Sequence, residues 1–144
     1  MVENDLVLYW DASAALSLLF NDIHSKTALV CWRKGTTHIL SSLAYVEVAA
    51  VISRLERTGT LDSFATETAF AKFAALGWRR TKIFPDDKII APYARKWPLR
   101  GADLWHLACA CTLHRQLPEL RLLTFDSRLH DAAVGEGIAV TFEL

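Results

Sequence analysis

The hydrophobic residues of this chain follow two alternating patterns. Short apolar runs bounded by polar residues are typical of strands that are buried on both faces. Longer stretches have apolar residues three and four positions apart and end near Gly or Pro, which is typical of helices. We therefore expect strands at 6–10, 38–40, 82–84, 121–125 and 138–142, and helices at 12–20, 25–32, 42–57, 66–76, 86–96, 104–115 and 127–136.

The alternation of strands and helices predicts the class of fold. Strands that are separated by helices usually pair in parallel, because the helix carries the chain back to the end of the sheet where the next strand begins. We therefore expect an α/β fold with a largely parallel sheet and helices on both faces. With 144 residues, 52% of them hydrophobic, and no linker or repeat, residues 1–144 should form one domain.

Composition narrows the functional classes. Sixteen basic and sixteen acidic residues give a net charge of zero, so nothing in the overall charge indicates nucleic acid or a membrane as partner. No apolar run approaches the roughly 20 residues that span a bilayer, and the acidic N-terminus is unlike a signal peptide. The odd number of cysteines, all in apolar surroundings, predicts buried thiols in a reducing cytoplasm: Cys31, Cys109 and Cys111.

Four acidic residues stand where an acid is unfavourable for folding alone. Asp11 and Asp126 directly follow apolar runs, at the C-terminal ends of expected strands, where open α/β sheets bind ligands. Glu47 and Asp103 interrupt or begin very apolar helical stretches, and a buried acid needs a partner. These positions make the four acids candidates for one functional site.

Each acid also has a purely structural interpretation. Asp11, Asp103 and Asp126 all precede expected helices, and Asp is a favoured N-cap residue. Glu47 lies inside its helix on the same face as core residues, so it would need to pair with an Arg such as Arg54 or with a backbone group. Structural roles for all four acids would require several coincidences.

A hard divalent cation is the physical reason to gather several carboxylates. Like charges in one pocket raise each other's pKa unless a cation relieves their repulsion. Neither Cys nor His stands at the four positions, which favours Mg²⁺ or Mn²⁺ over structural zinc. An all-oxygen site suits phosphodiester hydrolysis, with either one or two metal ions.

Four segments around these acids resemble the signature segments of PIN domains: 8–14, 41–49, 99–108 and 123–126. In order and spacing they most resemble the VapC ribonuclease toxins of toxin–antitoxin pairs. The resemblance covers essentially the whole chain. It implies a single PIN domain with a PIN-like, Rossmann-like α/β/α sandwich fold, and an endoribonuclease that depends on Mg²⁺ or Mn²⁺. It also implies a cognate VapB-like antitoxin, an RNA substrate and a homodimer.

Carried over by position, the resemblance also assigns the site residues. Ser13 and Thr124 would be auxiliary polar groups beside a catalytic, metal-binding set consisting of Asp11, Glu47, Asp103 and Asp126. Arg100 is our best candidate for an RNA phosphate contact, because it lies three residues before Asp103 and would be presented by the same turn.

Some neighbouring residues invite functional interpretations that we expect to fail. Trp10 and Trp105 flank the acids and should be core residues rather than platforms for base stacking. His106 and His114 lie on an otherwise apolar helix, where a histidine is usually a structural residue with satisfied hydrogen bonds.

Two other classes of function compete with the nuclease. In a phosphoaspartate protein, a receiver domain or a haloacid-dehalogenase-type phosphatase, Asp11 would accept the phosphoryl group. Such a phosphatase needs an acid two residues after the nucleophile, where this chain has Ser13. A non-catalytic PIN-like binding module would have little reason to retain all four acids.

Overall fold

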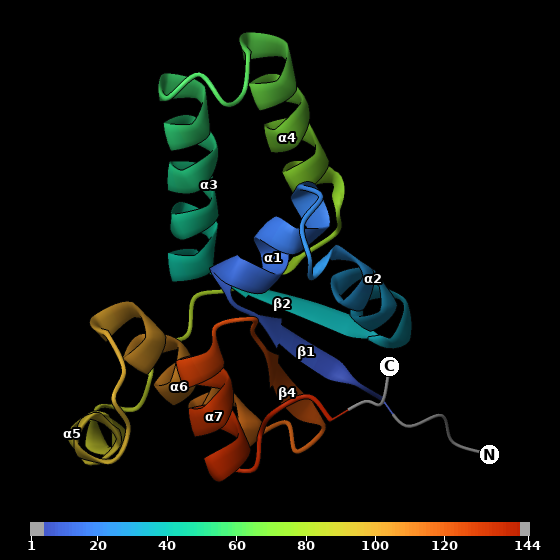
Figure 1. The fold of residues 1–144 in the computed structure, drawn as a ribbon. Coiled ribbons are helices and arrows are strands. Elements are labelled where there is room, and N and C mark those ends of the chain that lie inside the picture. Colours follow the sequence, from blue (N-terminus) through green and yellow to red (C-terminus); the bar gives the residue numbers. More distant parts are fainter. Residues whose placement is uncertain (1–4, 142–144) are drawn as a thin grey trace.

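The computed structural model describes residues 5–141 and contains a four-stranded, fully parallel sheet. The strands lie in the order β3-β2-β1-β4 (Figure 1). Their bounds are β1 Val7–Trp10, β2 Thr37–Ser41, β3 Arg79–Thr81 and β4 Leu120–Leu123. β1 pairs in parallel with both β2 and β4, so the C-terminal ends of these three strands lie next to one another. The predicted α/β fold with a parallel sheet is confirmed.

Seven helices within residues 5–141 connect and cover the strands. They are α1 Ala12–Leu19, α2 Ser25–Lys34, α3 Ser42–Arg57, α4 Ser63–Ala75, α5 Asp87–Lys96, α6 Gly101–His114 and α7 Ser127–Gly135. In Figure 1, α1 and α2 lie on one side of the sheet and α6 and α7 on the other. α3 and α4 stand side by side beyond the C-terminal ends of β1 and β2. None of these helices is long and apolar enough to cross a membrane.

Alternation along β1 divides the core between the two faces. Tyr9 points toward α6 and α7, where the buried cluster includes Leu107, Leu122 and Leu129. Trp10 points the other way, into the cluster under α1 and α2. Both aromatic side chains are fully buried. The predicted core role of Trp10 is confirmed, and the three cysteines are buried free thiols, as expected.

Two expected strands differ in the structure. The strand expected at 82–84 is instead β3 at Arg79–Thr81, and Phe84 is 82% exposed. An edge strand pairs through its backbone and needs no apolar pattern, so the apolar pair at 83–84 misled the prediction. The strand expected at 138–142 is reduced, within the described residues, to one parallel bridge between Leu122 and Ala139, with backbone hydrogen bonds from Leu122 N–H to the Ile138 carbonyl and from Val140 N–H to the Leu122 carbonyl. Residue 142 lies outside the described residues.

Candidate active site

Asp11 stands at the point where β1 becomes α1, and the residue is 4% exposed. Oδ1 accepts hydrogen bonds from the backbone N–H of Ala14 at 2.9 Å and the Ser13 hydroxyl at 2.7 Å. Oδ2 accepts a short hydrogen bond from the Thr124 hydroxyl. Burial raises the pKa of Asp11, while the hydrogen bonds from Thr124, Ala14 and Ser13 oppose that shift. Asp11 is therefore both the N-cap of α1 and a buried acid facing the end of β4.

Ser13 and Thr124 join the loops that follow β1 and β4. Besides bonding Asp11, the Ser13 hydroxyl accepts from the backbone N–H of Phe125 at 3.1 Å. The Thr124 hydroxyl likewise accepts from the N–H of Asp126 at 3.1 Å. A backbone bond from Asp11 N–H to the Leu123 carbonyl continues the strand pairing into these loops. The two auxiliary hydroxyls thus hold Asp11 and Asp126 in a common framework.

Asp126 is the N-cap of α7 and is exposed. Its Oδ1 accepts from the backbone N–H of Leu129 at 2.9 Å. The structural interpretation as a cap is therefore confirmed for both Asp11 and Asp126. Capping leaves the second carboxylate oxygen of Asp126 available, so it does not exclude a functional role.

Asp103 does not cap its helix. The N-cap of α6 is Arg100, and Asp103 is an acid within the first turn, so the capping interpretation of this acid is wrong. Partial burial raises its pKa, and repulsion from Asp126, Asp11 and Glu47 raises it further, while His106 opposes the shift. Asp103 is therefore close enough to the other three acids for their charges to affect its pKa.

Glu47 projects from α3, with its side chain 31% exposed. Its partner is His106 rather than Arg54 or a backbone group, which were the partners considered under the purely structural interpretation of this acid. The ring Nε2 of His106 lies 2.6 Å from Glu47 Oε1, and Nδ1 lies 2.7 Å from the Tyr9 hydroxyl. No signal along α3 could have revealed a partner 59 positions away.

Basic residues meet the acids in one cavity of about 270 Å³. Arg100 and Arg128 line it together with Asp103, Asp126 and Ser127. Sequence reasoning selected Arg100, whereas Arg128 was only one of several basic residues on the chain. Two arginines and two of the candidate acids therefore line the same cavity.

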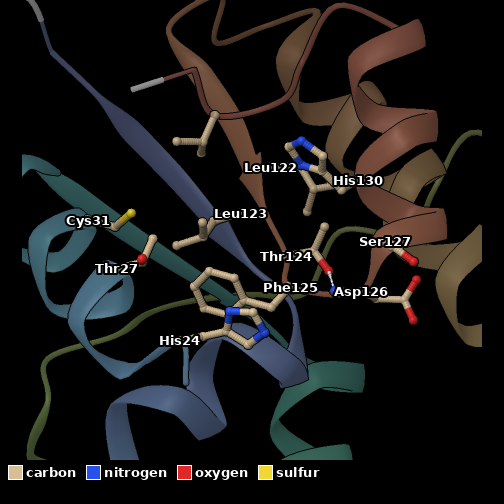
Figure 2. Close-up of a pocket in the computed structure, with 11 residues that line it drawn as sticks. His24, Thr27, Cys31, Leu122, Leu123, Thr124, Phe125, Asp126, Ser127 and His130 are labelled. Carbon is tan, nitrogen blue, oxygen red and sulfur yellow. Dashed lines mark hydrogen bonds between the residues drawn. The ribbon is translucent and has the colours of Figure 1, made fainter. Parts of the chain in front are cut away.

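A second cavity of about 370 Å³ begins next to the acids and is lined by the C-terminal end of β4, by α2 and by Val140. Figure 2 shows Thr124 and Asp126 at one end of it, joined by their hydrogen bond, and Cys31 and Thr27 of α2 farther along. The rings of His24 and Phe125 stack there, with their centroids 4.5 Å apart. This cavity is largely apolar, in contrast to the charged one.

The carboxylates do not form a ready-made metal cage. Within residues 5–141, no group of three or more His, Cys, Asp or Glu side chains is already arranged to hold an ion. Asp11 and Asp126 point oxygens at helix N-termini, and Glu47 is held by His106. The donor chemistry nevertheless fits a hard divalent cation, because all four groups are carboxylates, and burial together with repulsion from the other three raises the pKa of Asp103.

Comparison with known proteins agrees with this architecture. The sequence model of the PIN domain matches residues 8–135, and the chain belongs to the PIN domain family. Its relatives include Ribonuclease VapC45 and Ribonuclease VapC49 of Mycobacterium tuberculosis, each 30% identical over 138 residues, covering 93% of this chain and 94% of theirs. Ribonuclease VapC35 of the same species is 30% identical over 140 residues, covering 93% of this chain and 95% of its own. The resemblance expected from the four sequence segments is thereby confirmed.

A solved structure shows the same fold. The crystal structure of PAE2754 from Pyrobaculum aerophilum superposes with a TM-score of 0.64 at 18% identity. The alignment covers 94% of this chain and 88% of that one. At this identity the likeness concerns the fold alone.

Proposed function

We propose that this chain is an endoribonuclease toxin of the VapC type, which cleaves RNA phosphodiester bonds with a divalent cation. The observation that carries the proposal is the electrostatic coupling of Asp103 to Asp126, Asp11 and Glu47 at the C-terminal edge of a parallel sheet. Ligands bind at this edge in open α/β sheets. The names of the VapC relatives support ribonuclease activity.

The four carboxylates would hold Mg²⁺ or Mn²⁺. When bound, the cation supplies activation of water and neutralisation of charge on the phosphate. Asp103 accepts no hydrogen bond from the residues of the described part of the chain, so its oxygens are available. Ser13 and Thr124 hold the Asp11 carboxylate in a fixed position, and a bound cation would share its oxygens with these hydrogen bonds. The choice between one and two ions stays open.

Arg100 and Arg128 would contact the phosphates of RNA. Both line the charged cavity with Asp103 and Asp126, and a guanidinium group pairs well with phosphate oxygens. Other basic residues are already engaged: Lys96 pairs with Glu136 at 2.8 Å, and Arg115 with Asp86 at 2.7 Å. The net charge of zero is thus compatible with local binding of a polyanion.

The environment of Asp11 argues against the phosphoaspartate alternative. A phosphoryl acceptor must expose a carboxylate oxygen to the donor, but the Asp11 side chain is buried and both of its oxygens accept hydrogen bonds. Retention of all four acids argues against a binding module without activity. Neither alternative is favoured by a specific observation.

A VapB-like antitoxin and a second copy of the chain are the proposed partners. Exposed apolar side chains often mark interfaces. Among the large ones in the described residues, five lie on α3, on α4 and between β3 and α5: Tyr45, Val46, Phe64, Ile83 and Phe84. We propose that an apolar antitoxin segment packs on this surface and that a basic antitoxin residue competes for the carboxylates. The buried free thiols agree with a reducing cytoplasm. A single PIN domain over residues 1–144 remains part of the proposal.

Cleavage of RNA by the purified chain, free of antitoxin, tests the activity. We expect cleavage with Mn²⁺ or Mg²⁺ that stops with EDTA and returns when excess metal is added. Asp103→Asn should abolish it, because this substitution removes one carboxylate while preserving side-chain volume. Cleavage that persists unchanged in EDTA would contradict the metal mechanism.

Co-expression with the neighbouring open reading frame tests the partner. We expect co-elution in size-exclusion chromatography and inhibition of cleavage that weakens when a basic residue of the antitoxin is removed. A neighbour that neither co-elutes nor inhibits would contradict the toxin assignment while leaving the nuclease assignment intact.

A further inference from the structure

A buried histidine connects the first strand to one of the candidate metal-binding acids. His106 is 1% exposed and lies on α6 between Tyr9 of β1 and Glu47 of α3. Its Nδ1 is 2.7 Å from the Tyr9 hydroxyl and its Nε2 is 2.6 Å from Glu47 Oε1. Both ring nitrogens are therefore occupied, and one of their partners belongs to the candidate active site.

We propose that His106 is a positioning residue that holds the Glu47 carboxylate in the orientation needed to bind the divalent cation, with Tyr9 fixing the ring. This inference rests on the proposed function, because it concerns the acids assigned there to the metal. It adds two residues outside the four acids, each acting through another group rather than on the substrate.

The chemistry of the partners determines where the ring hydrogen lies. An ionised carboxylate can only accept hydrogen bonds, so Nε2 must carry a hydrogen and donate it to Glu47. In the neutral ring Nδ1 is then an acceptor, and the Tyr9 hydroxyl donates to it. With a neutral ring, the order of donation therefore runs from Tyr9 to His106 to Glu47.

Packing holds the ring in this orientation. The Tyr9 ring meets it edge-on with centroids 5.7 Å apart, and the Trp105 ring does so at 5.6 Å. Tyr9 itself is fully buried in the central strand β1. The ring is thus held by neighbours on two sides. Its hydrogen bond in turn restricts the Glu47 side chain on α3.

Glu47 needs such support more than the other acids do. Asp11 has a short side chain that three hydrogen bonds already hold, whereas Glu47 has a long side chain that is about one-third exposed. Ordering a long Glu side chain costs conformational entropy, which must otherwise be met when the metal binds. Residues that orient metal ligands in this way typically affect metal affinity by about 10- to 100-fold.

A merely structural histidine would behave differently, and the same helix offers a matched control. His114 lies two turns farther along α6, is partly buried, and has its Nδ1 3.1 Å from the Leu120 carbonyl. It contacts no acid of the site. Its loss should lower stability without changing the metal affinity of the folded protein.

Calorimetric titration of the full chain with Mn²⁺, without RNA, tests the proposal. We expect His106→Leu to weaken binding by about 10- to 100-fold and Tyr9→Phe by a smaller factor, while His114→Leu leaves it unchanged. His106→Gln, whose amide keeps an N–H near the position of Nε2, should recover part of the affinity. A folded His106→Leu variant that binds Mn²⁺ as tightly as the wild type would overturn the proposal.

A measurement on the unaltered chain keeps the proposal testable if the His106 variants do not fold. Nitrogen-15 NMR of the His106 ring should show the hydrogen on Nε2, whereas a neutral ring with its hydrogen on Nδ1 would overturn the inference. A wild-type chain that binds no Mn²⁺ would contradict the proposed metal site and this inference together. Wild-type binding that is indifferent to His106→Leu would contradict this inference alone.

Discussion

The hydroxyl of Thr124 donates to a carboxylate oxygen of Asp11, a residue 113 positions earlier in the chain. The same hydroxyl accepts the backbone N–H of Asp126. One side chain therefore ties together the two acids that follow adjacent parallel strands. This link holds Asp11 and Asp126 in fixed positions at the ends of the strands, whereas Glu47 and Asp103 project from helices.

Removing that hydroxyl should damage the site more than the fold. In Thr124→Val the shape is preserved, but Asp11 loses a donor and the Asp126 N–H loses its acceptor. We expect a stability loss of about 1–3 kcal/mol, because a buried polar group is left unsatisfied. RNA cleavage should fall at least 10-fold, as for other supporting groups of metal sites. Urea unfolding and a cleavage assay measure the two effects, and Thr124→Ser should restore most of both.

Asp11 should be essential for cleavage but replaceable as a cap. Asn is as good an N-cap as Asp, so Asp11→Asn should keep the bond to Ala14 and change stability by less than about 1 kcal/mol. Asp11→Ala should cost about 1 kcal/mol or more, since the cap is lost. Both variants should abolish cleavage. Residual activity in Asp11→Asn near that of the wild type would mean that the acid serves the fold only.

Asp103 should make stability depend on pH in metal-free buffer. Its pKa is raised by burial and by repulsion from Asp126 and Asp11, so the folded state binds the proton more tightly than the unfolded chain does. The stability contributed by this group is therefore greatest below the unfolded pKa, about 3.9, and falls as the pH rises through the folded pKa. We expect Asp103→Asn to be more stable than the wild type at pH 7, by a margin that shrinks toward pH 3.

Urea unfolding in EDTA across this pH range measures the margin. Added Mn²⁺ should reverse it at pH 7, because metal stabilises only the protein that binds it. A margin independent of pH would show that the raised pKa of Asp103 is not the cause.

Arg100 and Arg128 should affect RNA binding through charge. Each phosphate contact that is lost should reduce the salt dependence of binding to single-stranded RNA by about 0.7 in the log–log slope. We expect Arg100→Ala and Arg128→Ala to raise KM several-fold with little change in stability. Arg57→Ala is a suitable control, since Arg57 is exposed at the far end of α3. Equal effects of all three substitutions would indicate non-specific attraction only.

Gly135 should be required for packing rather than for flexibility. A Cβ at this position would lie 2.2 Å from the ring of Trp97, whose indole N–H is held by Glu136 at 2.9 Å. Although Ala is the better helix former, Gly135→Ala should destabilise the protein by about 1–3 kcal/mol through overpacking. At Gly101 no atom lies within 4 Å of an added Cβ, so Gly101→Ala should be neutral or slightly stabilising. Thermal unfolding of the two variants distinguishes these cases.

The sequence by itself determined the class of fold and the position of the acids that follow strands. Apolar runs marked β1 and β4, and parallel strands bring their C-terminal ends to one edge, so Asp11 and Asp126 could be expected to lie near each other. The apolar runs, and the alternation of strands and helices that predicts parallel pairing, can both be recognised from consecutive residues of the chain. The helix at 42–57 was likewise expected with its observed bounds.

Only the tertiary structure decided how the acids are held. The partner of Glu47 proved to be His106, and the support of His106 proved to be Tyr9, a residue that the sequence marks only as strand core. Tertiary structure also moved the edge strand to Arg79–Thr81, since backbone pairing at an edge requires no apolar side chains. Hydrogen bonds and charge repulsion act over a few ångströms of space, whatever the separation along the chain. The patterns of consecutive residues therefore could not specify them.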